Sequence, residues 1–239
     1  MKHQVFPSYA ALCRAVADEI AAVVRSRPNA LVCLASGHSP LGVFACLIDD
    51  VRNGRLNLSH CEWVGLDEWM GMNGADPGSC RQMMDEFLFH PLGVSPAKIH
   101  FFDGRAAHPM GEVDRIAKRI AEAGGLDVML VGIGTNGHIA MNEPGTPFST
   151  HTHISALAAE TIEVGQKYFQ SPTPLEKGIT LGLADFAESR LPILMANGPK
   201  KAAIIKRLLH EDQNEQLPAS ILHGLNHALL MTDQEASPN

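Results

Sequence analysis

The amino-acid sequence predicts a doubly wound α/β fold, in which a mostly parallel sheet is covered by helices on both faces. Short apolar runs alternate along the chain with longer segments whose apolar residues recur at helical spacing. The short runs are apolar at successive positions, which is typical of strands buried on both sides in a parallel sheet. A length of 239 residues suits one well-buried core. We therefore expect residues 1–239 to form a single domain with a Rossmann-like, three-layer arrangement.

The first half of the chain is predicted to supply two helices and three strands. Apolar residues recur at helical spacing over 8–27, and "LVCLA" (31–35) is a short apolar run typical of a buried strand. A second helix is expected over 40–54, because its apolar residues have the same spacing and a glycine ends the segment. The runs "CEWVGL" (61–66) and "KIHFF" (98–102) are predicted as the next strands.

The second half continues the same alternation. A helix over 113–123 is followed by two glycines and then by "DVMLVGI" (127–133), which is predicted as a strand. The run "LPILMA" (191–196) predicts another strand, the segment "PKKAAIIKRLL" (199–209) a helix, and "HALLMTD" (227–233) the last strand. Strands separated by helices pair in parallel, so one sheet with two covered faces follows.

Composition and charge exclude several classes of function. A net charge of −7, without clustered Lys and Arg, argues against a nucleic-acid partner. No stretch approaches the roughly 18 apolar residues of a membrane span, and the first residues lack the pattern of an export signal, so no membrane partner is expected. The five cysteines are scattered without CxxC spacing, which predicts a reduced, cytoplasmic protein without disulfides.

Three polar loops follow predicted strands. They are "ASGHSP" after the first strand, "LDEWMG" after the second, and "GIGTNGHIAMNEP" after the strand over 127–133. Open parallel sheets bind ligands beyond the carboxyl ends of their strands. The three loops are therefore expected to meet at one crevice.

The loop over 36–40 has the composition of an anion site. Small residues between a strand and a helix allow the backbone to approach a ligand, and the amide groups at a helix start favour a phosphate. The alternative is an ordinary helix start in which Ser39 caps and Pro40 occupies the first turn. The candidate phosphate-binding residues are Ser36, Gly37, His38 and Ser39.

The loop after the second strand carries a candidate base. Asp67 follows the strand directly, so its carboxylate is expected to project into the crevice. The alternative is an aspartate that caps a turn or a helix. Glu68 is interpreted as a polar loop residue.

The third loop carries a candidate acid–base pair, His138 and Glu143. Histidine exchanges protons near neutral pH, and a neighbouring carboxylate orients its ring and raises its affinity for a proton. The surrounding glycines at 132, 134 and 137 indicate an unusual backbone shape. The alternative is a structural histidine that only forms a hydrogen bond.

The remaining histidines do not predict a metal site. "HTH" (151–153), and His223 with His227, lack a third ligand at suitable spacing. We therefore expect no metal.

With these residues in view, the sequence resembles the glucosamine-6-phosphate deaminase/isomerase family, whose wider fold group includes 6-phosphogluconolactonases. The resemblance extends from "LVCLASGHSP" through "LDEW" and "GHIAMNEP" to "GITLGL" and "NGPKKA". "NGHIAMNEP" is its most specific part, because lactonases of the group carry a GHTASLFP-like string in that place. "HISAL", "GITLGL" and "LPASIL" resemble the galactosamine-6-phosphate deaminase branch.

The resemblance implies an enzyme that opens an amino sugar phosphate, isomerises it from aldose to ketose and releases ammonia, with no metal or redox cofactor. It implies that Asp67 shuttles the proton of the isomerisation. His138 would be the acid–base group of ring opening, and Glu143 would tune and orient it. Asn136 stands where well-studied members carry an aspartate, so Glu143 is expected to bear more of the electrostatic load.

The resemblance also implies how the phosphate is held. Residues 36–39 match the family's phosphate loop, although His38 stands where a glycine is common. Lys201 matches the family's phosphate lysine, and Lys167 stands where many members carry an arginine with its bidentate fork. His153 and Ser155 occupy positions where some members carry basic residues of an allosteric site, so hyperbolic kinetics are expected.

Two alternative functions share this fold. A 6-phosphogluconolactonase would use the phosphate loop and the histidine, but the retention of Asp67 and Glu143 argues against it. A non-catalytic sugar-phosphate sensor would be expected to carry a helix-turn-helix segment, and none is predicted. The resemblance leaves open whether the substrate is the glucosamine or the galactosamine phosphate, and whether the chain forms a homo-oligomer.

Overall fold

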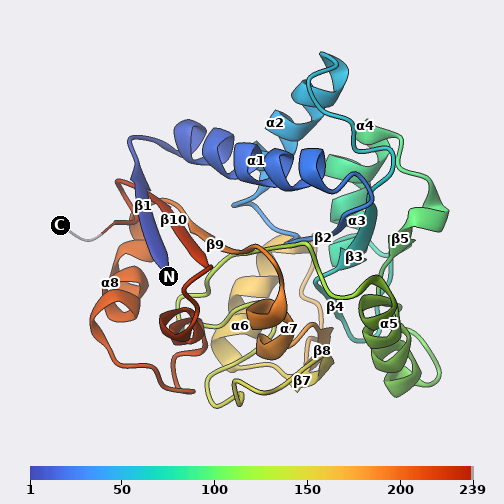
Figure 1. The fold of residues 1–239 in the computed structure, drawn as a ribbon. Coiled ribbons are helices and arrows are strands. Elements are labelled where there is room, and N and C mark those ends of the chain that lie inside the picture. The colour runs from blue at the N-terminus through green and yellow to red at the C-terminus, as the bar shows by residue number, and fades with distance from the viewer. Residues whose placement is uncertain (238–239) are drawn as a thin grey trace.

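A seven-stranded parallel sheet forms the centre of the computed structural model, which describes residues 1–237 (Figure 1). Every neighbouring pair of strands in it is parallel. In spatial order the strands are β1 (Lys2–Phe6), β10 (Leu229–Asp233), β9 (Pro192–Ala196), β6 (Val128–Val131), β2 (Leu31–Leu34), β3 (Glu62–Gly65) and β5 (Ile99–His100). The predicted α/β fold class is confirmed.

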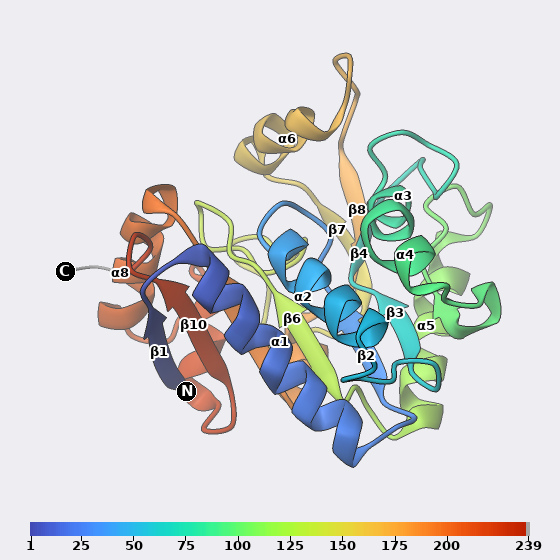
Figure 2. The same cartoon turned by 90° about the horizontal axis from the view of Figure 1, so that it is seen from above.

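Helices cover both faces of this sheet, as predicted. The helices α1 (Tyr9–Ser26) and α2 (Leu41–Arg52) pack on one face and lie side by side over the strands (Figure 2). On the other face lie α5 (Pro109–Ala123), α7 (Leu183–Glu188) and α8 (Ala202–His210). In the described residues 1–237, no helix is both long and apolar enough to cross a membrane.

Two hydrophobic cores explain why the central strands are apolar at every position. Along β2, Val32 and Leu34 join the core under α1 and α2, whereas Leu31 and Cys33 join the core on the opposite face. All four residues are buried. Burial on both faces is the property that the short apolar runs predicted.

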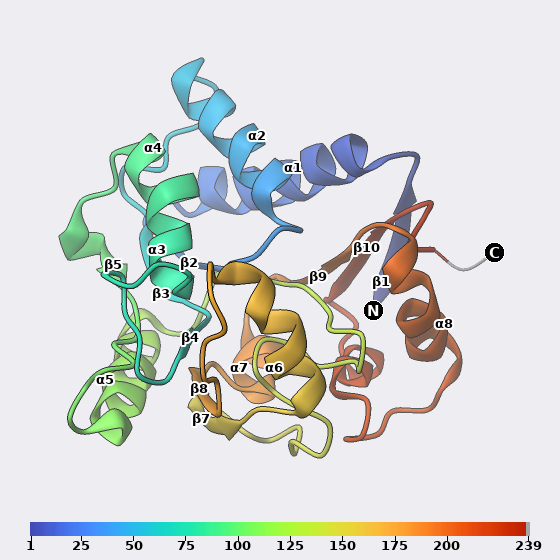
Figure 3. The same cartoon turned by 180° about the vertical axis from the view of Figure 1, so that it is seen from behind.

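A second, three-stranded antiparallel sheet was not predicted. It consists of β4 (Asp67–Trp69), β8 (Lys177–Thr180) and β7 (His153–Ala156), and it lies on the side of the main sheet away from α1 and α2 (Figure 3). β4 has only three residues and pairs with a strand more than a hundred positions away in the sequence. A strand this short has too few residues to show the periodic pattern of apolar residues from which strands are predicted. β1 was also missed, because it is a half-exposed edge strand.

The remaining helical segments are short, and two of them lie between β7 and β8. Residues 157–176 connect β7 to β8, and we call them the strap. The strap contains α6 (Ala159–Gly165) and η3 (Gln166–Tyr168). The segments outside the strap are α3 (Cys80–Met84), η1 (Asp85–Phe89), α4 (His90–Leu92), η2 (Pro96–Lys98), η4 (Pro199–Lys201) and η5 (Pro218–Gly224).

The start of α2 differs from the prediction. Ser39 does not cap the helix: Pro40 occupies the N-cap position, and the amide of Gly42 in the first turn donates to the Tyr9 hydroxyl at 2.9 Å. The Ser39 carbonyl instead accepts a hydrogen bond of 2.9 Å from the Tyr9 hydroxyl. The Ser39 side chain is thereby left on the loop, at the wall of the cavity described next.

Candidate active site

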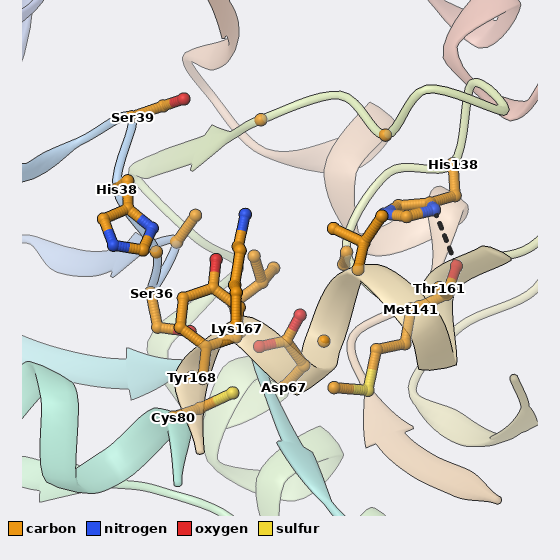
Figure 4. Close-up of a pocket in the computed structure, with 18 of the residues that line it drawn as sticks. Ser36, His38, Ser39, Asp67, Cys80, His138, Met141, Thr161, Lys167 and Tyr168 are labelled. Atoms are coloured by element: carbon orange, nitrogen blue, oxygen red, sulfur yellow. Dashed lines mark hydrogen bonds between the residues drawn. The ribbon is translucent and has the colours of Figure 1, made fainter. Parts of the chain in front are cut away.

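A cavity of about 230 Å³ opens at the carboxyl ends of β2, β3 and β6 (Figure 4). Its walls come from the loop over 36–40, from β4, from the glycine-rich turn over 132–138, from the strap and from the start of α8. The three polar loops that the sequence placed at strand ends therefore meet at one cavity, and Asp67 and His138 both line it. This edge of a parallel sheet is where such folds bind ligands.

Asp67 enters the cavity from the start of β4, one residue beyond β3. Pairing of β4 with Thr180 fixes its backbone, and its side chain is 8% exposed. Burial raises the pKa of Asp67 to about 6, and a hydrogen bond from the Cys80 thiol opposes this rise. A carboxylate that is ionised at neutral pH and poorly solvated is suited to act as a general base.

Glu68 is not the polar loop residue that the sequence suggested. It is fully buried, and its carboxylate accepts backbone N–H bonds from Trp69 at 3.0 Å, from Cys80 at 2.9 Å and from Arg81 at 2.9 Å. Burial raises the pKa of Glu68 to about 7, although these three bonds oppose the rise. Glu68 thus ties β4 to the start of α3, which supplies Cys80 to the cavity wall.

A tight turn after β6 presents His138 to the cavity. The Gly134 amide donates to the His138 carbonyl at 2.9 Å, and a Cβ on Gly134 would lie 2.3 Å from the imidazole. Gly137 has a φ of 91°, a left-handed conformation that favours glycine. These glycines are therefore required for the chain to pass close to the imidazole ring.

Glu143 and burial act in opposite directions on the pKa of His138. Its Nδ1 lies 3.2 Å from the Thr161 hydroxyl oxygen and 3.6 Å from Glu143 Oε2. Burial lowers the pKa of His138 below its ordinary value, and the charge of Glu143 opposes this only in part. The imidazole is consequently neutral at physiological pH and can accept a proton.

Asn136 and Glu143 lie behind the histidine. Asn136 donates from Nδ2 to Glu143 Oε2 at 2.9 Å, and its Oδ1 accepts the His138 amide at 3.1 Å. Neither residue is among those that line the cavity. Within the part of the chain that the structure describes, Glu143 Oε1 is buried without a hydrogen-bond partner.

The loop predicted to hold a phosphate lines the other end of the cavity. Ser36, Gly37, His38 and Ser39 all contribute to the wall. Gly37 has a φ of 124°, and its amide donates to Met83 Sδ at 3.1 Å. The His38 ring stacks on Tyr168 of the strap, with 5.4 Å between centroids and 15° between planes.

Two lysines line the same cavity from different elements. Lys201 donates from Nζ to the Ile133 carbonyl at 2.6 Å, and Lys167 Nζ lies 4.9 Å from the centroid of the Tyr168 ring. Burial lowers the pKa of both ammonium groups, with the charge of Lys200 adding to the effect on Lys167 and the charge of Lys167 to that on Lys201. Two cations that repel each other across a small cavity are stabilised by an anion between them.

Of the strap residues that line the cavity, the resemblance supplied only Lys167. Sequence reasoning missed Glu160, Thr161 and Tyr168, which line the cavity as well. No motif signals these residues, because their position depends on the pairing of β7 with β8 and not on local pattern.

The histidines weighed as metal ligands have other partners. His223 and His227 lie within hydrogen-bond distance of the backbone carbonyls of Leu208 and Ser189, and His151 pairs with Glu188. Nowhere in residues 1–237 do three His, Cys, Asp or Glu side chains gather so as to hold a metal ion.

Fold and cavity together define an α/β protein whose sheet carries, at its carboxyl edge, a cavity lined by Asp67, His138 and two lysines. A family model described as glucosamine-6-phosphate isomerases/6-phosphogluconolactonase matches residues 7–231. The chain therefore belongs to this family, as the resemblance implied.

Individual relatives agree with this assignment. A glucosamine-6-phosphate deaminase of Geobacillus sp. (strain WCH70) is 34% identical over 96% of this chain and 92% of its own. A glucosamine-6-phosphate deaminase of Clostridium beijerinckii is 33% identical over 98% of both chains. The solved structure of a monomeric glucosamine-6-phosphate deaminase superposes with a TM-score of 0.95 at 31% identity, covering 99% of this chain and 98% of its own. The 6-phosphogluconolactonase of Trypanosoma brucei shares the fold, with a TM-score of 0.76 at 21% identity over 98% of this chain and 97% of its own.

Proposed function

We propose that this protein is an amino sugar phosphate deaminase. It converts glucosamine-6-phosphate or galactosamine-6-phosphate, with one water, into the ketohexose 6-phosphate and ammonia. The observation that carries the proposal is that Asp67 and His138 line one cavity together with Lys167 and Lys201. The deaminases among its relatives support it. Because charged sugar phosphates do not cross membranes unaided, the same proposal implies a cytoplasmic enzyme.

The phosphate of the substrate binds at the basic end of the cavity. Residues 36–39 contribute to the wall there, and Lys167 and Lys201 supply the positive charge. Binding a dianion relieves the repulsion between the two lysines, which makes this end selective for phosphorylated sugars. A fixed phosphate places the sugar ring toward the opposite wall, where Asp67 and His138 lie.

His138 opens the sugar ring. Its Nε2 takes the proton of the anomeric hydroxyl and returns a proton to the ring oxygen, so that the bond between carbon 1 and the ring oxygen breaks and the free aldehyde forms. Its lowered pKa, which follows from burial, keeps the imidazole neutral and ready for the first transfer. Glu143, held by Asn136, stabilises the imidazolium that forms between the two transfers.

Asp67 then isomerises the opened sugar. Its carboxylate removes the proton from carbon 2 and returns it to carbon 1, while a proton passes from the amino nitrogen to the oxygen on carbon 1. The carbonyl at carbon 1 thereby becomes a hydroxyl, and carbon 2 becomes the carbon of an imine. Water adds to carbon 2 of the imine, and ammonia leaves as the ketone forms. The pKa of about 6 that burial gives Asp67 makes it a stronger base than an exposed aspartate, while it remains ionised at neutral pH.

A direct assay tests the proposal and resolves the substrate. The purified protein is incubated separately with each amino sugar phosphate, and ammonia and ketohexose 6-phosphate are measured together. Equal amounts of both products from at least one epimer support the proposal. If neither product is released from either epimer, the proposal is overturned. The activities to measure next are then hydrolysis of 6-phosphogluconolactone and binding of a sugar phosphate without turnover.

A further inference from the structure

The strap makes a direct contact with the imidazole of His138. The Thr161 hydroxyl oxygen lies 3.2 Å from Nδ1, although the two residues are 23 positions apart (Figure 4). Thr161 belongs to α6 and is 7% exposed. The contact is therefore buried and joins the strap to the glycine-rich turn.

Glu143 does not take this position. Its Oε2 is 3.6 Å from Nδ1, which is beyond hydrogen-bond distance, and the same oxygen already accepts the Asn136 amide at 2.9 Å. The hydroxyl of Thr161 is thus the nearer polar group to this ring nitrogen. Glu143 acts on the ring through its charge instead.

This arrangement selects between the two neutral forms of the imidazole. A carboxylate only accepts hydrogen bonds, and its negative charge favours a proton on the nitrogen nearer to it, which is Nδ1. The Thr161 oxygen can accept that proton's hydrogen bond. Nε2 then keeps its lone pair, and Figure 4 shows this nitrogen directed toward the part of the cavity where Lys167 and Asp67 lie.

We propose that Thr161 is a positioning residue for His138: its hydroxyl oxygen accepts from Nδ1–H and so holds Nε2 as the base that faces the substrate. The catalytic consequence rests on the proposed function, whereas the tautomer does not depend on it. Since Thr161 belongs to the strap, correct placement of the strap becomes a condition for an active imidazole.

Nitrogen NMR of the protein labelled with 15N-histidine reads the tautomer without any activity assay. His138→Gln assigns the signals. Wild type is expected to show neutral His138 as the Nδ1–H form. Thr161→Val, which removes the hydroxyl at nearly constant shape, is expected to show a mixture of tautomers, and Thr161→Ser is expected to retain the wild-type form. Thr173→Val is the matched control, because Thr173 lies in the strap and its hydroxyl donates to the Ser171 carbonyl.

Kinetics of the same variants provide a second readout. Thr161→Val is expected to lower kcat about tenfold with KM within about twofold, as loss of one hydrogen bond to the acid–base group implies. Thr161→Ser should recover most of kcat, and Thr161→Ala replaces the valine variant if melting shows that it does not fold.

An Nε2–H form in wild type, or a valine variant with wild-type spectrum and kcat, would overturn the role of Thr161. The expected spectra from a protein that releases no ammonia would instead overturn the deaminase function and leave the contact in place.

Discussion

Asn136 donates a hydrogen bond of 2.9 Å to Oε2 of Glu143, and its own Oδ1 accepts the amide of His138. The asparagine thus fixes the carboxylate behind the imidazole and fixes the backbone of the histidine at the same time. It adds no charge, which leaves Glu143 as the carboxylate that faces Nδ1. Among the charged groups that act on the pKa of His138, Glu143 therefore has the largest effect, ahead of Lys201 and Glu160.

Removal of the Glu143 charge is expected to slow the reaction. Glu143→Gln keeps the shape and lets the amide oxygen accept from Asn136, but it no longer stabilises an imidazolium, so kcat should fall about tenfold to a hundredfold. The pKa of His138 should fall further, because the charge of Glu143 raises it in wild type. Steady-state rates and histidine NMR measure the two effects. Glu163→Gln, an exposed change in α6, is the control. A wild-type rate for Glu143→Gln would show that the charge of Glu143 does not contribute to catalysis.

The pH dependence should report the ionisation of Asp67. A base must be unprotonated, and burial raises the pKa of Asp67 to about 6. We expect kcat/KM to be level above this pH and to fall about tenfold per unit of pH below it. The measurement is kcat/KM for ammonia release between pH 4.5 and 8. A value of kcat/KM that stays level down to pH 4.5 would show that the essential base is an ordinary exposed carboxyl.

The burial of Asp67 should also lower the free energy of unfolding at neutral pH. Its pKa rises from 3.8 in the unfolded chain to about 6 in the folded one, so the folded state binds the proton more tightly. Stability should decrease as pH rises through this window, and the full cost is present above pH 6. Asp67→Asn is therefore expected to raise the free energy of unfolding at pH 7.5 by about 2 to 3 kcal/mol. Urea denaturation at pH 7.5 and at pH 4 measures the difference, which should disappear at the lower pH.

Glu68 should act mainly through structure. Glu68→Ala leaves three buried N–H groups at the β4–α3 junction without their acceptor, and we expect the free energy of unfolding to fall by about 2 to 4 kcal/mol. Glu122→Ala, on the exposed side of α5, is the control. Thermal and urea unfolding provide the measurement, and a loss within about 0.5 kcal/mol would show that water replaces the carboxylate.

Lys201 should determine affinity for the phosphate. Lys201→Ala is expected to raise KM about tenfold or more with a smaller change in kcat, because the phosphate is remote from the reacting carbons. Lys206→Ala, an exposed change in the same helix, should leave both constants unchanged. Inhibition by inorganic phosphate should weaken in parallel with the rise in KM. A change confined to kcat would show that Lys201 acts in the chemical step and not in binding of the phosphate.

Regulation by an anionic sugar is not expected. His153 and Ser155 of β7 stand where some family members carry basic residues of an allosteric site, and neither offers a permanent positive charge. Rate curves should therefore be hyperbolic, and an N-acetyl amino sugar phosphate should not change them. Sigmoidal curves that this compound renders hyperbolic would reveal a regulatory site elsewhere.

The sequence predicted those parts of the fold that depend on local pattern. β2 and β6 are short apolar runs buried on both faces. Helices such as α1 have apolar residues at helical spacing and a capping residue next to them in the sequence. The polar loops at strand ends could be placed at one edge because the topology of a parallel sheet requires it.

The parts that were missed depend on distant contacts. Glu68 is structural because α3 folds back onto β4, and Thr161 reaches His138 because the strap crosses the cavity. The residues that neighbour Glu68 and Thr161 in the sequence do not indicate either contact. The expected N-cap role of Ser39 was wrong for the same reason, since Tyr9 of α1 binds the loop from outside it.

The account depends most on Asp67 as the base that acts on a sugar opened by His138 in the same cavity. The most direct test is the rate of ammonia release from the preferred amino sugar phosphate by wild type and by Asp67→Asn, with folding and phosphate binding verified for both. The account predicts a fall of about a thousandfold for the variant, within the range of a general base. A variant rate within about tenfold of wild type would contradict it.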